Sequence, residues 1–327
     1  MGATKSRLLG FTPRYPHFKA FKEVAPGFWN LRAPFFVLGG TLNIGTQMSI
    51  VELAPNAFAA IDCCPLTASA ATELNELTSG GELLVAVLTT HPFHTKAIGT
   101  FHASYPSSAE RKWYGCPRHL AKVTRDANDR PIDWAGDLNN CSVRRKFEPV
   151  LLMSIPDGAE FVNPVPPTRN HLSTVLVLHV PSKVVHVDDC INWIEGPGLL
   201  MRLAGFSDRT LHFHPSLTSV GLQPTQQAPL QFREWVRATL VDGWDFEHLV
   251  SAHNGVLIGN AKSKVAALLA KTDDTLRKLS IKNAQADAER RASAAWDGSA
   301  SQAESQAGPA SDVRCSDCWS DVDIDCG

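Results

Sequence analysis

Short apolar runs separated by turn residues dominate the first third of the chain. Residues 28–32, 48–53 and 57–61 are apolar or alternating, and Gly, Pro or Asn bounds these runs, which predicts strands. The continuous apolar run at 85–88 predicts a buried strand. Residues 66–77 instead show helical spacing, and the Ser-Gly-Gly sequence that follows would end the helix.

Strands and helices are interleaved in the rest of the chain. Two strands are predicted at 174–180 and 183–187, joined by a Pro-Ser turn, and a last strand at 246–252. Residues 191–203 carry Gly196 and Pro197, which favours a broken helix. The remaining predicted elements are a helix at 96–104, strands at 113–115 and 146–153, and helices at 230–240 and 261–279, with an extension over 284–295. Strands outnumber helices, which predicts an α+β sandwich of sheets with helices outside.

Length and charge narrow the class of protein. A chain of 327 residues can bury a large core without disulfides. The net charge is −2 and no dense Lys/Arg stripe occurs, so we expect no nucleic-acid partner. No apolar run reaches the length of a membrane span, and the N-terminus lacks the apolar core of a secretory signal. We therefore expect a cytoplasmic protein whose eight cysteines are reduced.

Both ends of the sequence carry short motifs. The opening MGATKS fits the pattern for myristoylation of Gly2, which would give reversible membrane contact, and an unmodified N-terminus is the alternative. Cys315 and Cys318 have C-x-x-C spacing with Cys326 nearby. Their acidic, Ser-rich setting favours an accidental pair and leaves their role open. From residue 299 onward the composition predicts a disordered acidic tail.

Histidines and aspartates stand at the ends of several apolar runs. Strand ends can bring distant residues together at one rim of a sheet, and imidazole is the commonest protein ligand for zinc and suits iron. An ion held there lowers the pKa of bound water to roughly 7. The candidate residues are His91, His94, His171, Asp188, Asp189 and His253.

These motifs resemble those of the metallo-β-lactamase-fold superfamily. Its signature is T-H-x-H-x-D-H after a strand, then a His in a loop, an Asp after a strand, and a final G-H-G. Thr90-His91 matches the opening, and the loop with His171, the strand that ends at Asp189 and the segment around His253 resemble the rest. The likeness covers about residues 21–280 and implies a four-layer αββα sandwich. The predicted organisation is an N-terminal extension at 1–20, a metallo-β-lactamase-like domain at 21–284, and a helix end with disordered tail at 285–327.

The first motif departs from the family pattern. Phe93 takes the second His slot, Thr95 the Asp slot and Lys96 the third His slot, and His94 is displaced by one residue. The resemblance therefore implies one metal ion rather than two, with zinc first and iron or manganese as alternatives. The implied metal ligands are His91, His171, Asp189 and His253, and the implied catalytic residues are His94, as a further ligand or proton carrier, and Asp188.

Each of these residues also has a structural interpretation. The histidines of the first motif can hydrogen-bond backbone at a turn, and Asp189 can cap a helix. His212 and His214 flank Phe213 and mimic a ligand pair, yet a surface or cleft strand is favoured for them. The other histidines, assigned to packing or to the surface, are His102, His119, His179 and His186.

Taken with the family's chemistry, the motifs imply a metal-dependent hydrolase. In this hypothesis, a hydroxide generated at the ion attacks an ester, thioester, lactone or phosphoester of a small molecule. The alternative is a non-catalytic protein that keeps the fold and binds a ligand or partner through an eroded site without metal. An iron-dependent oxidoreductase is a third hypothesis. Whether the chain is an enzyme, its substrate and its oligomeric state are left open by the sequence.

Overall fold

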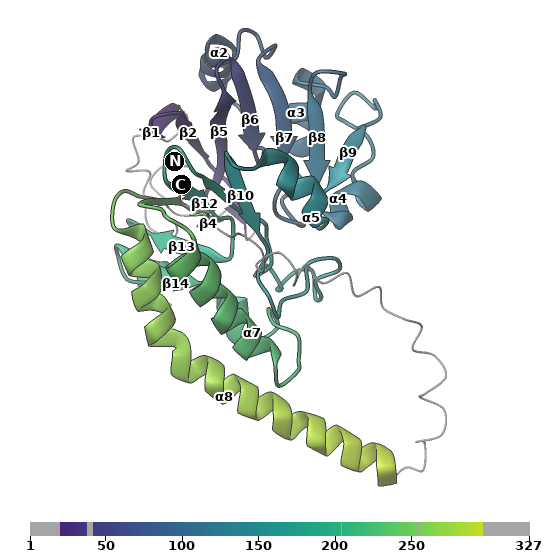
Figure 1. Cartoon of the computed structure of the whole chain (residues 1–327), viewed down its shortest axis with the longest axis vertical. Coiled ribbons are helices and arrows are strands. Elements are labelled where there is room, and N and C mark those ends of the chain that lie inside the picture. Colours follow the sequence, from purple (N-terminus) through teal and green to yellow (C-terminus); the bar gives the residue numbers. More distant parts are fainter. Residues whose placement is uncertain (1–19, 38–41, 204, 254, 297–327) are drawn as a thin grey trace, which may run out of the picture.

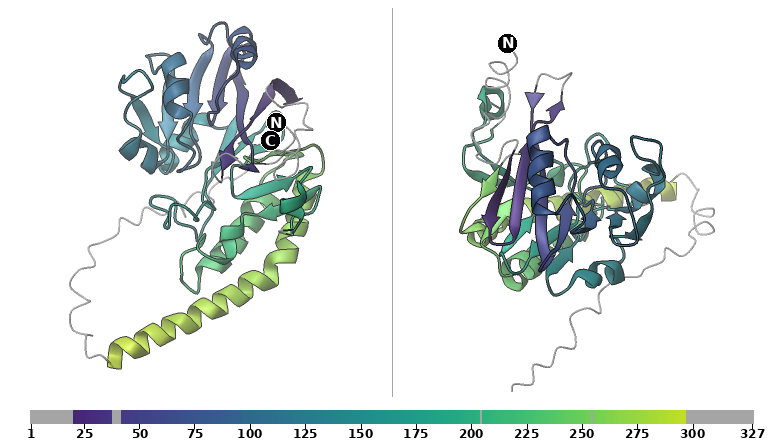
Figure 2. Two further views of the ribbon diagram at one scale, coloured as in Figure 1. Left: turned by 180° about the vertical axis from the view of Figure 1, so that it is seen from behind. Right: turned by 90° about the horizontal axis from the view of Figure 1, so that it is seen from above.

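Two β-sheets lie face to face, with helices on both outer sides (Figures 1 and 2). The computed structural model describes residues 20–37, 42–203, 205–253 and 255–296. The myristoylation motif, the acidic tail and its three cysteines lie outside these residues. Within the described part, no helix is both long enough and apolar enough to cross a membrane.

The first sheet has seven strands in the order β1-β2-β5-β6-β7-β8-β9. The strands up to β6 pair antiparallel, and β6 to β9 pair in parallel. Their bounds are β1 Phe21–Ala25, β2 Phe28–Ala33, β5 Thr46–Ala54, β6 Ala57–Ile61, β7 Leu84–Leu88, β8 Lys112–Gly115 and β9 Trp134–Asp137. Because parallel strands run the same way, the chain leaves β6 and β7 at the same edge of this sheet.

The second sheet has five strands in the order β10-β11-β12-β15-β16. Here β12 and β15 pair in parallel and the other neighbours antiparallel. The bounds are β10 Leu151–Ser154, β11 Leu176–His179, β12 Val184–His186, β15 His248–Val250 and β16 Val256–Leu257. Two small hairpins complete the strands: β3 Phe36–Val37 with β4 Leu42–Asn43, and β13 Ile191–Ile194 with β14 Thr210–Phe213.

Helices cover the outer face of each sheet. On the first sheet they are α2 Ala68–Leu77, α3 Ile98–Ser104, α4 Pro117–Lys122 and α5 Cys141–Arg144 with the short η1 Arg145–Phe147. On the second they are α7 Ala228–Trp235, continued by the π-helix η3 Val236–Gly243, and α8 Ala261–Trp296. The short α6 Leu199–Leu203 and η2 Pro215–Thr218 lie beside β14 in sequence. Figure 1 shows the last turns of α8 running past the body of the domain.

Three separate hydrophobic cores identify four layers. One core packs β5, β6 and β7 against α2 and α3, a second fills the space between the sheets, and a third packs β11, β12 and β15 against α7 and α8. Successive residues of one strand enter different cores: Ala60 faces the helices, whereas Ala59 and Ile61 face the other sheet. A strand buried on both faces is apolar at every position, as the sequence runs indicated. The predicted four-layer αββα sandwich is confirmed.

Several element predictions need correction. Residues 191–203 form strand β13 and the short α6 instead of one broken helix, because Ile191 and Trp193 pair across β13–β14 in an extended hairpin. The strand predicted at 146–153 is shorter, starting at Leu151, since Pro149 lacks the N–H that a ladder position needs. The predicted domain end at 284 falls inside α8, and this boundary stays a prediction.

His119 makes the fold sensitive to acid. Burial lowers the pKa of its imidazole to about 4, and its Nδ1 accepts the Cys116 N–H and contacts the Thr89 hydroxyl at 2.8 Å. The unfolded chain binds this proton near pH 6.5, whereas the folded chain resists it, so acid favours unfolding. We expect His119 to remove about 3 kcal/mol of stability between pH 6.5 and pH 4.

The measurement is urea unfolding at a series of pH values for the native chain and His119→Gln. The variant should show a shallower loss of stability over this interval. Equal slopes for the two proteins would contradict the assignment.

Candidate metal centre

The ends of strands from both sheets meet at one place, where four of the six predicted site residues bring ligand atoms together: His91, His94, His171 and Asp189. A fifth, His253, contacts Asp189 Oδ1 through Nε2 at 2.8 Å. His91 and His94 follow β7, His171 precedes β11, Asp189 follows β12, and His253 follows β15. The backbone N–H of His94 donates to His91 O at 3.1 Å, and this tight turn returns the His94 ring to within 4.3 Å of the His91 ring. A turn of this kind removes the one-residue displacement that the sequence indicated for His94.

Asp189 lies at the middle of the cluster. Its Oδ2 is 3.5 Å from His91 Nε2, 3.4 Å from His94 Nε2 and 3.2 Å from His171 Nδ1. Zinc bonds of roughly 2.0–2.1 Å in tetrahedral geometry place neighbouring ligand atoms roughly 3.4 Å apart. One donor atom from each of these four residues lies within 4.8 Å of the other three. This His/Asp group can therefore hold a metal ion.

Outward hydrogen bonds and an ion-pair contact fix the orientation of three of the rings. His171 Nε2 donates to Pro167 O at 3.0 Å, and His253 Nδ1 donates to Gly45 O at 2.8 Å. His94 Nδ1 lies 2.6 Å from Asp188 Oδ2. If such a ring is neutral, its proton lies on the outward nitrogen and its inward nitrogen presents a lone pair, as in metal-ligating histidines.

His91 is held from the opposite side of its ring. Its Nδ1 accepts the Phe93 N–H at 3.2 Å, and its Nε2 lies 3.2 Å from His171 O as well as near Asp189. The His91 side chain is 0% exposed. It is thus the innermost ring of the cluster.

An unsatisfied carboxylate oxygen provides a test of whether these residues fit a cation. Asp189 Oδ1 is buried and has no hydrogen-bond partner among the described residues, although His253 Nε2 lies 2.8 Å away. A buried anionic oxygen without a hydrogen-bond partner is costly, and a cation held by the cluster would offset its charge.

The ionisation of the cluster follows from burial and charge. Burial raises the pKa of Asp189, but the charges of His253 and His94 outweigh it and hold that pKa well below the usual range. Burial and the neighbouring His94 lower the pKa of His91 well below 6.5. Burial would lower the pKa of His94 as well, yet Asp188 and Asp189 raise it well above 6.5. Burial raises the pKa of Asp188.

A buried polar network under the cluster was missed by sequence reasoning. Asp62 accepts the Thr90 N–H and the Thr90 hydroxyl, both at 2.7 Å, and lies 2.9 Å from His186 Nε2. Burial raises the pKa of Asp62, but its bonds to His186 and Thr90 lower it overall. Asp62 directly follows the apolar run 57–61, so it carried the same signal as Asp189, an aspartate at a strand end.

The network continues to the other ligand loops. Gln47 Nε2 donates to Val187 O at 2.7 Å, just before Asp188. Arg32 donates to Ser251 O and, at 3.0 Å, to Ala252 O, just before His253. Together with Asp62 at Thr90, strands of the first sheet thus hold the backbone immediately before three of the loops that carry the cluster.

His212 and His214 have different neighbours, and only one of them lies beside the cluster. The His214 ring lies 6.1 Å from the His171 ring, and burial lowers its pKa. Its Nδ1 accepts the Ser216 N–H at 3.1 Å. His212 instead contacts the Thr210 hydroxyl at 2.8 Å. His214 thus borders the cluster, and His212 does not.

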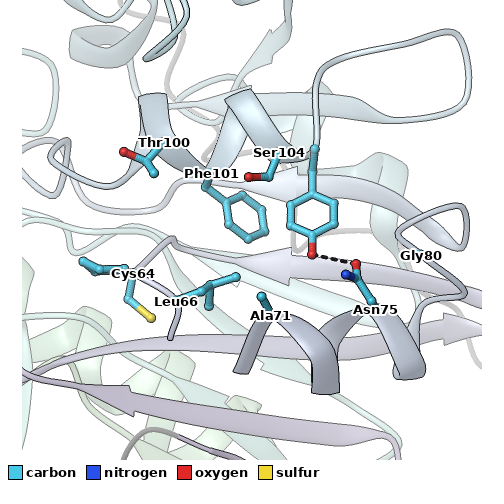
Figure 3. A pocket seen from close by; sticks show the side chains of 10 residues that line it. Cys64, Leu66, Ala71, Asn75, Gly80, Thr100, Phe101 and Ser104 are labelled. Carbon is cyan, nitrogen blue, oxygen red and sulfur yellow. Dashed lines mark hydrogen bonds between the residues drawn. The ribbon is translucent and has the colours of Figure 1, made fainter. Parts of the chain in front are cut away.

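A separate pocket of about 400 Å³ lies between α2 and α3. Figure 3 shows its lining, including the hydrogen bond from the Tyr105 hydroxyl to Asn75 Oδ1 at 2.9 Å. None of its lining residues belongs to the His/Asp cluster. Burial raises the pKa of the Cys64 thiol in this pocket to about 12, so the thiol is not a nucleophile at neutral pH.

No protein-family model and no curated protein sequence matches the chain. Solved structures similar to it are metallo-β-lactamases. FIM-1 from Pseudomonas aeruginosa, in a mono-zinc form, shares 12% identity over 77% of this chain and 95% of its own, with a TM-score of 0.45. The Hirschia baltica enzyme shares 13% over 76% and 96%, with a TM-score of 0.44. The Erythrobacter litoralis enzyme shares 13% over 77% and 96%, with a TM-score of 0.47. They belong to the family that the motifs resemble.

Proposed function

We propose that the chain is a hydrolase that holds one divalent metal ion, zinc in the first instance. Its substrate is a small molecule with an ester, thioester, lactone or phosphoester bond. The observation that carries this proposal is the spacing of three imidazole nitrogens around Asp189 Oδ2, from 3.2 to 3.5 Å. These distances match neighbouring ligands of a single tetrahedral ion.

The proposed ligands are His91, His94, His171 and Asp189. His253 contacts the second oxygen of Asp189, with Nε2 2.8 Å from Oδ1. When bound, such an ion lowers the pKa of water to roughly 7 and stabilises negative charge that develops on the substrate. Among the described residues a second ion has no comparable set of ligands, because Phe93 and Thr95 occupy positions where the family has further ligands.

The chain's own residues orient the site and define its opening. The side chains of His94, His171 and His253 are 19%, 26% and 16% exposed, so a substrate approaches from their side while His91 closes the back. Asp188, which is 1% exposed, holds the His94 ring through Nδ1. We therefore assign Asp188 the role of orienting His94, and His94 the role of a ligand rather than a free proton carrier.

Metal titration tests this proposal. The purified chain is stripped with a chelator and titrated with Zn²⁺ by calorimetry, and its metal content is measured by mass spectrometry. We expect a single tight site, and hydrolysis of 4-nitrophenyl acetate or bis(4-nitrophenyl) phosphate that appears with the ion and disappears with chelation. A chain that binds no zinc, iron or manganese would overturn the proposal and favour a non-catalytic binding protein.

A further inference from the structure

A serine, a histidine and an aspartate form a chain of contacts beside α3, the helix on the outer face of the seven-stranded sheet. His102 lies in α3, and its Nδ1 is 2.9 Å from Asp126 Oδ2. Its Nε2 is 3.2 Å from the hydroxyl of Ser107, which follows the helix. None of these three residues belongs to the His/Asp cluster. A serine nucleophile, its general base and the carboxylate that orients the base are joined in this order.

The contacts of His102 determine which ring nitrogen carries the proton. The backbone N–H of Ser107 donates to Nε2 at 3.1 Å, so Nε2 has a lone pair and the proton lies on Nδ1, where Asp126 accepts it. Asp126 also accepts the N–H groups of Asn128 and Arg130 at 2.8 and 3.0 Å, and Arg130 Nε at 2.9 Å. Burial raises the pKa of Asp126, but its bonds to His102 and Arg130 outweigh this and hold that pKa well below the usual range. The carboxylate is therefore charged, and His102 presents a base to Ser107.

The Ser107 hydroxyl is oriented and lies near the surface. Its oxygen accepts the Asp133 N–H at 3.3 Å, so its own proton is left to face His102. Ser107 is half-buried and the three residues after it are exposed, whereas His102 is 1% exposed. The nucleophile thus faces solvent, and its base lies behind it.

Two basic side chains hold the backbone on either side of Ser107. Arg111 Nη1 donates to Pro106 O, and Lys112 Nζ donates to Ser108 O, each at 3.1 Å. When a hydroxyl attacks a carbonyl carbon, negative charge develops on the carbonyl oxygen, and positive charge nearby stabilises that state. Ser107 therefore has a base on one side and cations close to it in the same loop.

A second set of the same three residue types lies inside the protein and provides a comparison. Ser49 Oγ is 3.0 Å from His186 Nδ1, and His186 Nε2 is 2.9 Å from Asp62 Oδ2. Ser49 and His186 are both 0% exposed, so no substrate reaches this serine. Of the two serines, only Ser107 can meet a molecule from outside.

We propose that Ser107 is a nucleophile that accepts an acyl group from an activated carboxylic ester, with His102 as its general base. The Ser107 oxygen attacks the carbonyl carbon of the ester while His102 Nε2 takes the hydroxyl proton. The bond from that carbon to the leaving oxygen then breaks, and the proton passes from His102 to the leaving alcohol. An ester of Ser107 remains. This reaction is separate from hydrolysis at the His/Asp cluster and uses none of its residues.

The acyl group is expected to stay on Ser107. Nε2 of His102 faces the Ser107 hydroxyl in the resting protein, but an esterified oxygen has no proton to give. The Ser107 N–H is then the remaining contact of Nε2, and water has to displace it before the base can activate that water. With chelator present, 4-nitrophenyl acetate should therefore release about one equivalent of 4-nitrophenolate per chain and then stop.

Labelling with diisopropyl fluorophosphate tests the proposal. The serine oxygen displaces fluoride from phosphorus, His102 takes the proton, and the phosphate ester on the serine is stable. The metal-stripped chain is labelled with chelator present, and labelled peptides are identified by mass spectrometry. We expect the label on Ser107 and none on the buried Ser49. Ser107 should react at least about a hundredfold faster than the exposed Ser104 at the end of α3, since a general base contributes about a hundredfold or more.

Variants separate the base from the mere presence of a serine. Ser107→Ala should abolish the label, and His102→Gln should slow labelling of Ser107 about a hundredfold, with zinc binding intact as evidence of folding. Ser104→Ala is the matched control and should react as the native chain does. No label on Ser107, equal rates for Ser107 and Ser104, or an unchanged rate in His102→Gln would overturn the proposal. The comparison of the two serines is made within the native chain, so it decides the outcome even if His102→Gln does not fold.

Discussion

Replacing Asp189 by Asn is expected to weaken zinc binding by roughly a hundredfold to a thousandfold and to abolish hydrolysis. The carboxylate faces three imidazole nitrogens through Oδ2 and His253 through Oδ1. A structural zinc site of four ligands contributes about 10–16 kcal/mol, so one lost ligand corresponds to about 3 kcal/mol or more. The amide keeps the shape of the side chain but removes its charge. Calorimetric titration with Zn²⁺ measures the change.

Asp188→Asn is the matched control, since Asp188 is adjacent and equally buried. Its side chain contacts His94 Nδ1 rather than the centre of the cluster. Loss of a group that orients a ligand typically costs about 10–100-fold in affinity, so the effect should be the smaller of the two. A larger loss in Asp188→Asn than in Asp189→Asn would contradict the ligand assignment.

Replacing Asp62 by Asn is expected to lower the free energy of unfolding by about 3 kcal/mol. Removing one partner from a buried hydrogen-bonded charge pair costs about 3–5 kcal/mol, and Asp62 bonds both Thr90 and His186. Because Thr90 directly precedes His91, zinc affinity should also fall by about 10–100-fold. Urea unfolding of the metal-free chain and zinc titration report the two effects separately.

Asp126→Asn is the control that distinguishes a loss of stability from a loss of zinc affinity. Asp126 is another buried aspartate beside a histidine, His102, at 2.9 Å, and it is not part of the network under the cluster. The control should lower stability without changing zinc affinity. If both variants lose zinc affinity equally, the loss follows general destabilisation, and Asp62 does not position His91.

Much of the fold could be predicted because several apolar runs in this chain are continuous. Strands such as β6 and β7 are buried on both faces, so the continuous apolar sequence led directly to buried strands. Polar residues at the ends of such runs then indicated His91, Asp189 and His253. Short strands with mixed composition could not be predicted. For example, β13 is stabilised by its pairing with β14, and its own sequence has no strand pattern.

The parts of the site that could not be predicted from the sequence depend on three-dimensional contacts. The convergence of His94 follows from a backbone bond to His91 within one turn, which motif alignment without a gap cannot represent. Full burial of His186 agrees with a packing role, but the sequence does not indicate its contact with Asp62, a residue far from it in the chain. Its role comes from the apposition of two sheets, and no local pattern records that.

The division of the cluster between the two sheets has a mechanical consequence. His91 and His94 belong to the half of the chain that builds the seven-stranded sheet, whereas His171, Asp189 and His253 belong to the half that builds the five-stranded one. An ion bound by both sets would link the two sheets of the sandwich. His91 and His171 alone are 80 residues apart, and closing so long a loop takes much entropy from the unfolded chain. Loading the ion would therefore fasten one half of the protein to the other, and protease resistance of loops far from the cluster would rise with it.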